Sequence, residues 1–129
     1  MTTTPAAPFG LAQIGQIGVN VRDLDRAVAF YRDALGLRFL FATPALAFFD
    51  CAGVRLMLSL PEQASFDHPS SILYFTVADL QAAYDTLTAR GVAFVDEPHL
   101  IARMPDHELW MAFFNDTEGN MHGLMCEVR

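Results

Sequence analysis

Apolar and polar positions along the chain follow one pattern that occurs twice. The stretch GVNVRDLDRAV (residues 18–28) and the stretch YFTVADLQAAY (residues 74–84) match at one constant offset. The matching residues are Val21, Asp23, Leu24 and Ala27 in the first copy and Val77, Asp79, Leu80 and Ala83 in the second. In each copy alternating apolar residues predict a strand, V-x-D-L follows, and an apolar repeat of helical period comes next. We therefore expect two halves with the same order of elements.

Each expected helix has a start signal and a stop signal. Asp23 and Asp79 are predicted N-caps, because a carboxylate accepts hydrogen bonds from the free N–H groups of the first turn. Gly36 and Gly91 stand where a left-handed residue is favoured after the last turn. The apolar helix faces consist of Leu24, Ala27, Val28, Tyr31 and Leu35 in the first half and of Leu80, Ala83, Tyr84 and Leu87 in the second.

Outside the helices, apolar residues recur with period two, which is typical of strands. The expected strands cover residues 14–21, 38–43, 46–50 and 54–60, and then 71–77, 92–95, 109–115 and 121–128. Residues 61–70 are polar with two prolines, which favours a linker. The pattern predicts an α+β fold of two tandem βαβββ modules that form a curved mixed sheet around a cavity, with the helices outside. We expect a single domain over residues 1–129, with module one at about 11–60 and module two at about 71–129.

Strand parity sorts the side chains onto two faces. One face is apolar and is predicted to pack under the helices; it carries Ile17, Val19, Val21, Leu56, Leu58, Leu60, Leu73, Phe75 and Val77. The other face is mixed, and from it come the candidate ligand-binding residues Gln16, Asn20, Arg55, Met57, Ile72, Tyr74, Met121, Gly123 and Met125. A mixed inner face favours a ligand cavity. The alternatives are a sheet face open to solvent and one buried against a second subunit.

Composition narrows the function. The 129 residues are 53% hydrophobic, and 15 acidic against 8 basic residues give a net charge of −7. This balance predicts no nucleic-acid partner, because phosphate binding needs clustered positive charge. All eight bases are Arg, which excludes Schiff-base chemistry and a P-loop lysine. The sequence also has no G-x-S-x-G, G-x-G-x-x-G or C-x-x-C motif.

The sequence predicts a cytoplasmic location without a membrane partner. Residues 1–10 have neither the basic start nor the long apolar stretch of a secretory signal. No apolar run approaches the roughly 20 residues that a bilayer crossing needs. Cys51 and Cys126 are too few for a disulfide framework, so we expect reduced, structural thiols.

Two stretches of the chain resemble the vicinal oxygen chelate superfamily, which includes glyoxalase I, extradiol dioxygenases and the bleomycin and fosfomycin resistance proteins. They are VRDLDRAVAFYRDALGL (residues 21–37) and FFNDTEGNMHGL (residues 113–124). A third stretch, EPHLIARMPDHELWMAFF (residues 97–114), resembles a group of bacterial glyoxalase-like proteins. The resemblance covers about residues 14–128. It implies the paired βαβββ fold and leaves the reaction open, since this scaffold hosts many chemistries.

The resemblance also implies where a metal would bind. Metal-dependent members place His, Glu or Gln at four inner-face positions, which here hold Gln16, Met57, Ile72 and Gly123. A hard divalent ion needs several oxygen or nitrogen ligands, and only Gln16 offers one. We therefore expect no metal cofactor. The alternative is a divalent ion held through His122 after a one-residue shift of the last strand, or through a loop folded deep into the cup.

Among the histidines, His99 and His107 are the catalytic candidates. They lie with Glu97, Asp106 and Glu108 in a long connection before the strand at 109–115, and a histidine beside a carboxylate is typical of a general base. The alternative is an ordinary polar loop with two surface imidazoles. His68 is expected to be solvated in the linker, and His122 is expected to point toward the helices.

Two further inner-face residues have open interpretations. Arg55 either anchors a carboxylate or phosphate of a ligand or pairs with an acid such as Asp50. Tyr74 is expected to face the cavity. The methionines suit an adaptable pocket and equally suit core or interface packing.

Three functions follow. The first is a metal-free binding protein for a small apolar or amphipathic molecule, of the glyoxalase/bleomycin resistance type. The second is a glyoxalase-like lyase or isomerase, or a dioxygenase-like member, that acts on a dicarbonyl, thioester or related substrate. The third is a structural subunit without turnover. Related small proteins pair so that two open cups complete each other, which implies a homodimer.

Overall fold

A computed structural model of the chain describes residues 9–129. Most of the stretch interpreted above as lacking a secretory signal therefore lies outside the described residues. Module one contains β1 (Gln16–Asn20), α1 (Leu24–Ala29) with a π-helical continuation (Phe30–Ala34), β2 (Arg38–Ala42), β3 (Leu46–Cys51) and β4 (Val54–Ser59). Module two contains β5 (Tyr74–Thr76), α2 (Leu80–Ala89), β6 (Ala93–Phe94), β7 (His99–Arg103), β8 (Glu108–Asn115) and β9 (Met121–Val128). A short 3₁₀ turn (Ala64–Phe66) lies in the linker between them.

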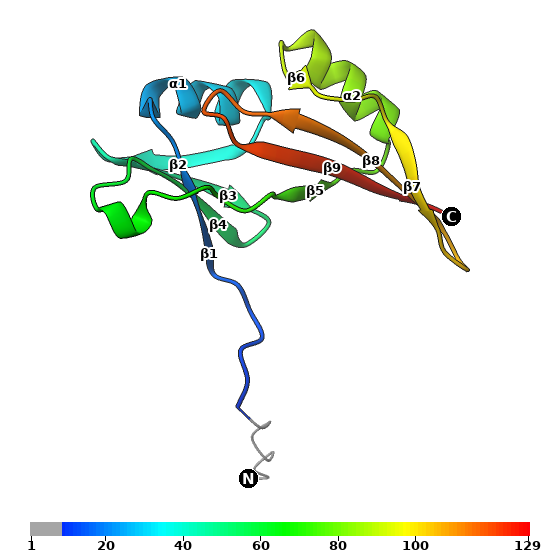
Figure 1. Cartoon of the computed structure of the whole chain (residues 1–129), viewed down its shortest axis with the longest axis horizontal. Helices are drawn as coiled ribbons and strands as arrows, with labels where there is room; N and C mark the ends of the chain where they lie inside the picture. The colour runs from blue at the N-terminus through cyan, green and yellow to red at the C-terminus, as the bar shows by residue number, and fades with distance from the viewer. Residues whose placement is uncertain (1–8) are drawn as a thin grey trace.

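The strands form two sheets. Sheet A has the order β1-β4-β3-β2, and sheet B has the order β5-β9-β8-β6 with β7 also paired to β8. In each sheet the first strand pairs in parallel with the last strand of its module, β1 with β4 and β5 with β9. Both helices lie on one side of the sheets (Figure 1). The α+β fold class is confirmed. The strand pairing shows two separate sheets, one in each module, where the sequence predicted one curved mixed sheet.

The helix signals act as the sequence predicts. The Asp23 carboxylate accepts a hydrogen bond of 3.0 Å from the Arg26 N–H, and Asp79 accepts one of 3.0 Å from Ala82. Gly91 has φ +88°, a left-handed conformation that an L side chain rarely adopts. Local capping therefore fixes the beginning and the end of each helix.

The connection before β8 differs from the prediction of a loop. Residues 99–103 form strand β7, in which His99 pairs with Met111. β6 and β7 pair with opposite ends of β8 and together occupy the place of one strand. At the break, the Asp96 carboxylate accepts a 2.8 Å hydrogen bond from the Phe113 N–H. The interruption near Pro98 and a bulge within β7 obscure the period-two pattern in the sequence.

The apolar face packs under the helices as predicted. Module one buries a cluster of Val19, Val21, Leu24, Ala27, Tyr31, Ala47, Phe49, Leu56 and Leu58. Module two buries Leu80, Leu87, Val92, Ala112, Phe114, Leu124 and Cys126. Phe30 and Leu35 of module one pack against both clusters, and Leu73 of module two packs against the first. The two modules therefore share one continuous apolar layer between helices and sheets.

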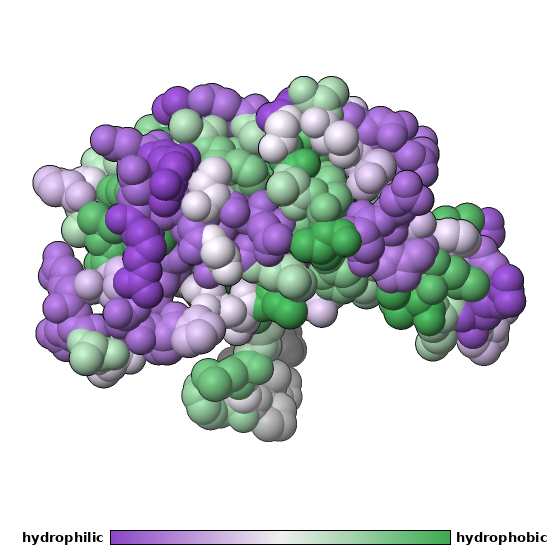
Figure 2. Space-filling view, turned by 45° about the horizontal axis from the view of Figure 1, so that its top comes forward, coloured by the Kyte–Doolittle hydropathy of each residue, from purple (hydrophilic) through white to green (hydrophobic). Residues whose placement is uncertain are grey.

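Residues 9–15 precede β1 and extend away from the body of the molecule on the side opposite the helices (Figure 1). Phe9 is 95% exposed and Leu11 is 96% exposed. Figure 2 shows hydrophobic surface on this segment, clear of the body. Within residues 9–129, neither helix has the length and apolar character that crossing a membrane requires.

Candidate functional site

The mixed face of module one forms one wall of a cavity of about 790 Å³, a volume typical of small-molecule sites. The linker covers the cavity from the opposite side. The wall and the cover include Gly18, Asn20, Met57, Ser59, Phe66 and His68. This cavity therefore lies on module one and the linker alone, and of the predicted ligand-binding residues Asn20 and Met57 line it.

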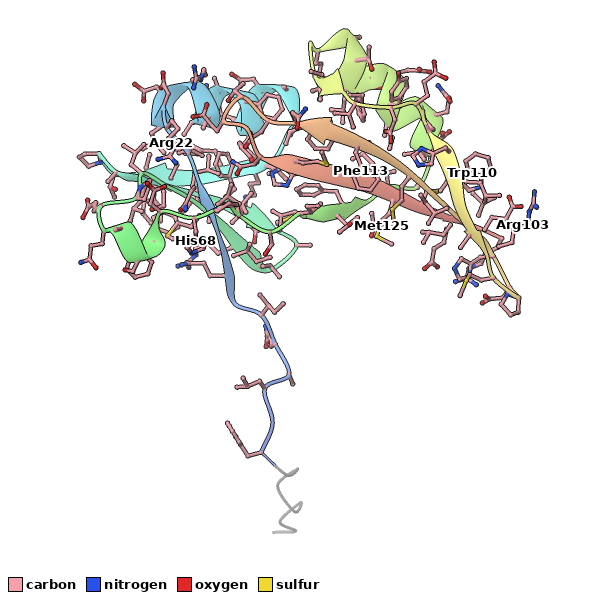
Figure 3. All side chains as sticks on the ribbon, viewed as in Figure 1. Arg22, His68, Arg103, Trp110, Phe113 and Met125 are labelled. Atoms are coloured by element: carbon pink, nitrogen blue, oxygen red, sulfur yellow. The ribbon has the colours of Figure 1, made fainter. Side chains whose placement is uncertain are left out.

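Asn20 holds the linker over this cavity. Its side-chain amide donates hydrogen bonds of 2.6 Å to the Phe66 carbonyl and 2.8 Å to the His68 carbonyl. Its backbone N–H donates a 2.9 Å hydrogen bond to the Ser70 hydroxyl. Figure 3 shows His68 beside this part of the linker. Asn20 thus positions the cavity cover in addition to lining the cavity.

A second, smaller hollow of about 440 Å³ lies between the linker and the β8–β9 turn. Ile72 and Met121 line it, together with Asn20 and His68. His68, which the sequence assigned to solvent, therefore lines both hollows. Ile72 and Met121 are therefore the predicted binding residues of module two that lie near module one, on either side of this hollow.

Gln16, Arg55 and Met57 share the mixed face of sheet A, with Gln16 directly across from Arg55. The Gln16 amide lies 3.6 Å from the Met57 sulfur. Asp50, the predicted ion-pair partner of Arg55, instead lies 3.8 Å from Arg38. The Arg55 guanidinium lies over the Phe48 ring, 5.8 Å from its centroid. Among the described residues, Arg55 has no ion pair, so its charge remains available to a ligand.

The mixed face of module two is open. Tyr74 is 48% exposed, and Met125 lies on the side of β9 away from the helices (Figure 3). The Tyr74 and Phe113 rings meet edge to face at 5.9 Å. They cover Gly123, where an added Cβ would lie 3.1 Å from both rings. The predicted binding residues Tyr74, Gly123 and Met125 therefore form an aromatic and thioether surface outside the module one cavity.

The four positions that the resemblance assigns to a metal do not fit a divalent ion. Gln16 supplies one neutral amide, which points toward the Met57 sulfur, and Ile72 has no donor atom. The position of Gly123 is covered by two aromatic rings, which leaves no room for a carboxylate. Within residues 9–129, no group of three or more His, Cys, Asp or Glu side chains is placed to hold a metal together. Hard cations need such oxygen and nitrogen ligands.

The structure does not bring His99 and His107 together. His99 begins β7, whereas His107 follows its end, about 13 Å further along at the usual strand rise. The Nδ1 atom of His99 lies 3.6 Å from the Asp96 carboxylate, and that of His107 lies 2.7 Å from Asp106. Only His107 is therefore hydrogen-bonded to a carboxylate, because the Nδ1 atom of His99 lies 2.9 Å from the Glu97 carbonyl oxygen. The two rings lie at opposite ends of one strand.

A buried polar chain under the helices was not anticipated. His122 is fully buried, as its predicted orientation requires, and its Nδ1 accepts a 3.3 Å hydrogen bond from the Leu73 N–H. The other ring nitrogen lies 2.8 Å from the Tyr31 hydroxyl, which donates a 2.7 Å hydrogen bond to Asp116. Burial lowers the pKa of His122 and Asp116 partly offsets this effect, so the neutral ring is favoured. Because Nδ1 accepts the Leu73 hydrogen bond, the proton of the neutral ring is on Nε2. Burial and Asp116 raise the pKa of Tyr31, so the hydroxyl keeps its proton.

Glu118 joins the β8–β9 turn of module two to the start of α1. One carboxylate oxygen accepts hydrogen bonds of 2.7 Å from the Arg22 N–H and 2.8 Å from the Asp23 N–H. The other accepts hydrogen bonds from the Arg26 guanidinium and the Thr117 hydroxyl, each of 2.8 Å. Burial alone would raise the pKa of Glu118, but these four donors prevail and lower it to about 2. The turn that follows β8 therefore fixes module one against module two.

We expect the stability of the protein to depend on Glu118 in acid. Its pKa falls from an ordinary 4.5 to about 2 on folding. The free energy that Glu118 contributes to the folded state is therefore fully present above pH 4.5. It is lost as the pH falls from 4.5 to about 2, because the Glu118 carboxylate of the unfolded chain is protonated at a higher pH than that of the folded chain. Urea unfolding across this range should show a weaker pH dependence in Glu118→Gln than in the natural chain, and lower stability at neutral pH. Glu97→Gln, at an exposed position, is the control; an equal effect there would contradict the assignment.

Comparison with known proteins agrees with the fold. The sequence profile of the family described as the Glyoxalase/Bleomycin resistance protein/Dioxygenase superfamily matches residues 13–123. The chain belongs to this superfamily, which confirms the resemblance seen in its sequence.

Individual relatives are distant but span nearly the whole chain. A "Glyoxylase-like domain-containing protein" of Didymella fabae is 26% identical and covers 87% of this chain and 91% of its own length. A superfamily member from Sphaerobacter thermophilus has a solved structure with a TM-score of 0.73, 26% identity, and coverage of 91% of this chain and 98% of its own. A lactoylglutathione lyase from Agrobacterium tumefaciens has a TM-score of 0.69 at 23% identity, and covers 91% of this chain and 95% of its own. The last likeness is one of fold alone.

Proposed function

We propose that the protein binds a small, apolar or amphipathic molecule in the module one cavity, without a metal. The observation that carries the proposal is the cavity itself, about 790 Å³ in volume, with a cover that Asn20 holds by hydrogen bonds. Met57 and Phe66 give it apolar surface, and Ser59 and His68 give it polar groups. Such a combination is typical of ligand sites.

Filling the cavity tests this proposal. A Cβ on Gly18 would meet only the Met57 methyl group, at an ordinary 3.6 Å, so Gly18→Leu places a side chain in the cavity without a backbone clash. We expect the neutral dye Nile red to bind the natural chain saturably, by fluorescence titration, and to lose that binding in Gly18→Leu. Gly15→Leu, with nothing within 4 Å of its new Cβ, is the matched control. Equal binding by both variants would contradict the proposed site.

We expect the purified protein to contain no stoichiometric zinc, nickel, manganese or iron. The support is the donor set, in which only Gln16 of the four superfamily positions offers an oxygen or nitrogen ligand. Elemental analysis measures the metal content, and a chelator should leave the melting temperature unchanged. About one ion per chain, lost in Gln16→Ala, would overturn the expectation and favour a metal-dependent enzyme.

We also propose that two chains associate into a homodimer. The open face of module two and the apolar segment at residues 9–15 both lie uncovered on the side away from the helices. A second copy on this side would cover Leu11, which is 96% exposed, and Tyr74, which is 48% exposed, and would remove their apolar surface from water. Sedimentation at micromolar concentration should give twice the chain mass of 14.3 kDa, and a monomer there would contradict the proposal.

A lyase or isomerase that uses His99 and His107 is the less supported function. Asp106 beside His107 gives that ring the partner of a general base. However, neither histidine lines the module one cavity. Turnover of a hemithioacetal or dicarbonyl compound, lost in His107→Gln, would favour the enzyme over the binding protein.

We propose a cytoplasmic location for the protein. Cys51 and Cys126 are both free thiols, as expected of a protein kept in a reducing compartment.

A further inference from the structure

The polar end of the module one face carries an excess of positive charge. The strand register aligns Arg38, Asp50, Arg55 and Gln16 across β2, β3, β4 and β1 in one row. Two guanidinium groups therefore accompany a single carboxylate. This local balance is opposite in sign to the chain as a whole, which has a net charge of −7.

Arg55 is the member of this row that is free to bind an anion. The Asp50 carboxylate is occupied by the Gly53 N–H at 3.2 Å and by Arg38 at 3.8 Å. Among residues 9–129, no carboxylate forms an ion pair with Arg55. Its guanidinium is instead held over the Phe48 ring at 5.8 Å, an arrangement that orients the group and leaves its N–H edges free.

The next row of the same face is apolar. Phe41, Phe48, Met57 and Gly18 are aligned across the four strands. The Phe41 and Phe48 rings stack with centroids 4.6 Å apart, and Phe41 is 49% exposed. Gly18 has no side chain to cover Met57. This row continues directly into the cavity, of which Gly18 and Met57 are lining residues.

We infer that the bound molecule is an amphipathic anion, with a carboxylate on Arg55 and a flat apolar body along Met57 toward the cavity. This inference rests on the proposed function and assigns the chemical class of its ligand. Met57 is two residue steps along β4 from Arg55, or about 7 Å, and Ser59 is four steps, or about 13 Å. A bicyclic aromatic acid spans this range. Arg55, the one guanidinium of this row without a carboxylate partner among residues 9–129, would repel a cationic group at the same place.

An anionic ligand is also consistent with the residues that stand at the superfamily's metal-ligand positions. Gln16 and Met57 stand where the resemblance implies metal ligands, and they do not fit a divalent ion. Arg55 is directly across from Gln16 and two residues from Met57, so a fixed guanidinium supplies positive charge beside these positions. A planar guanidinium binds a carboxylate through two parallel hydrogen bonds, which requires no metal.

A matched pair of probes tests the ligand class. 2-Naphthoate and its neutral amide, 2-naphthamide, have the same shape and differ in charge. By isothermal titration of the full chain at neutral pH, we expect 2-naphthoate to bind at least about tenfold more tightly, as a charge-assisted contact implies. Arg55→Gln should remove this preference and leave the affinity for 2-naphthamide unchanged. Arg103→Gln, on β7 and paired with Glu108, is the control and should keep the preference.

The outcomes separate this inference from the proposed function. Equal affinity for the two probes, a preference that persists in Arg55→Gln, or no binding of 2-naphthoate would each overturn the assignment of an anionic ligand. In each of those cases, loss of Nile red binding in Gly18→Leu would still support the cavity as a binding site. A thermal unfolding curve of Arg55→Gln that matches the natural chain excludes a folding defect as the cause of lost binding.

Discussion

Replacing Leu58 by alanine should lower the free energy of unfolding by about 2–5 kcal/mol. Leu58 lies on β4 and is fully buried in the module one cluster with Val19 and Phe49. The substitution removes apolar contacts and leaves a cavity that a close-packed core closes only in part. Urea unfolding monitored by circular dichroism measures the change. Phe75→Ala, on the corresponding face of β5, should also destabilise the chain, because the Phe75 ring is partly buried against the module two cluster.

Met57→Ala is the control for this prediction, because it changes the adjacent residue of the same strand on the opposite face. Met57 is only half-buried and lines the cavity. We expect the loss of stability to be about 1 kcal/mol or less, together with weaker binding of the Nile red probe. If Met57→Ala destabilised the chain as much as Leu58→Ala, the assignment of the two faces would be wrong.

Asp116→Ala should destabilise the chain by about 3 kcal/mol, because it removes the acceptor of several buried hydrogen-bond donors at once. One Asp116 oxygen accepts hydrogen bonds from the Glu118 and Asn120 N–H groups, each of 2.8 Å. The other accepts hydrogen bonds from the Tyr31 hydroxyl at 2.7 Å and the Asn120 amide at 2.8 Å. Alanine leaves these donors without an acceptor, and an unsatisfied buried polar group costs about 1–3 kcal/mol.

Asp33→Ala is the matched control, because Asp33 is an exposed aspartate bonded to its neighbour Arg32. Its effect should stay within about 0.5 kcal/mol. Tyr31→Phe should fall between the two, since it removes one hydroxyl from the buried chain and leaves the other Asp116 bonds in place. Equal midpoints of urea unfolding for Asp116→Ala and Asp33→Ala would show that the buried chain adds nothing to stability.

The buried chain and Glu118 also explain how the modules are joined. Asp116, Glu118 and His122 all come from the end of module two, and their hydrogen bonds reach Tyr31 and the start of α1 in module one. Their other partners, Leu73, Thr117 and Asn120, lie within module two. Residues 9–129 leave no buried side-chain nitrogen or oxygen without a hydrogen-bond partner. The polar contacts therefore fix the relative position of two modules whose shared apolar layer is not directional.

The sequence by itself determined the elements of this protein and their faces. The N-caps Asp23 and Asp79, the stop at Gly91 and the core position of Leu58 follow from periodicity and local chemistry, which act over a few residues. The repeated V-x-D-L segment and the closing DTEGN turn likewise carried the superfamily resemblance. Strand β7 was not predicted from the sequence, because a bulge and Pro98 break the alternation on which a strand prediction depends.

Only the tertiary structure decided how distant segments meet. Tyr31 and Asp116 are 85 residues apart in sequence, and Glu118 and Arg22 are 96 apart, so no local pattern pairs them. The sequence did contain one signal for this network, because it placed Tyr31 and His122 on faces that point toward the core. Buried polar side chains need hydrogen-bond partners, but the sequence does not show which residues these are. Likewise, the sequence placed Arg55 on the inner face but left its partner open, because Arg38 and Asp50 approach each other only through strand register. The linker became a cavity cover for the same reason, since Asn20 reaches it across 46 residues of chain.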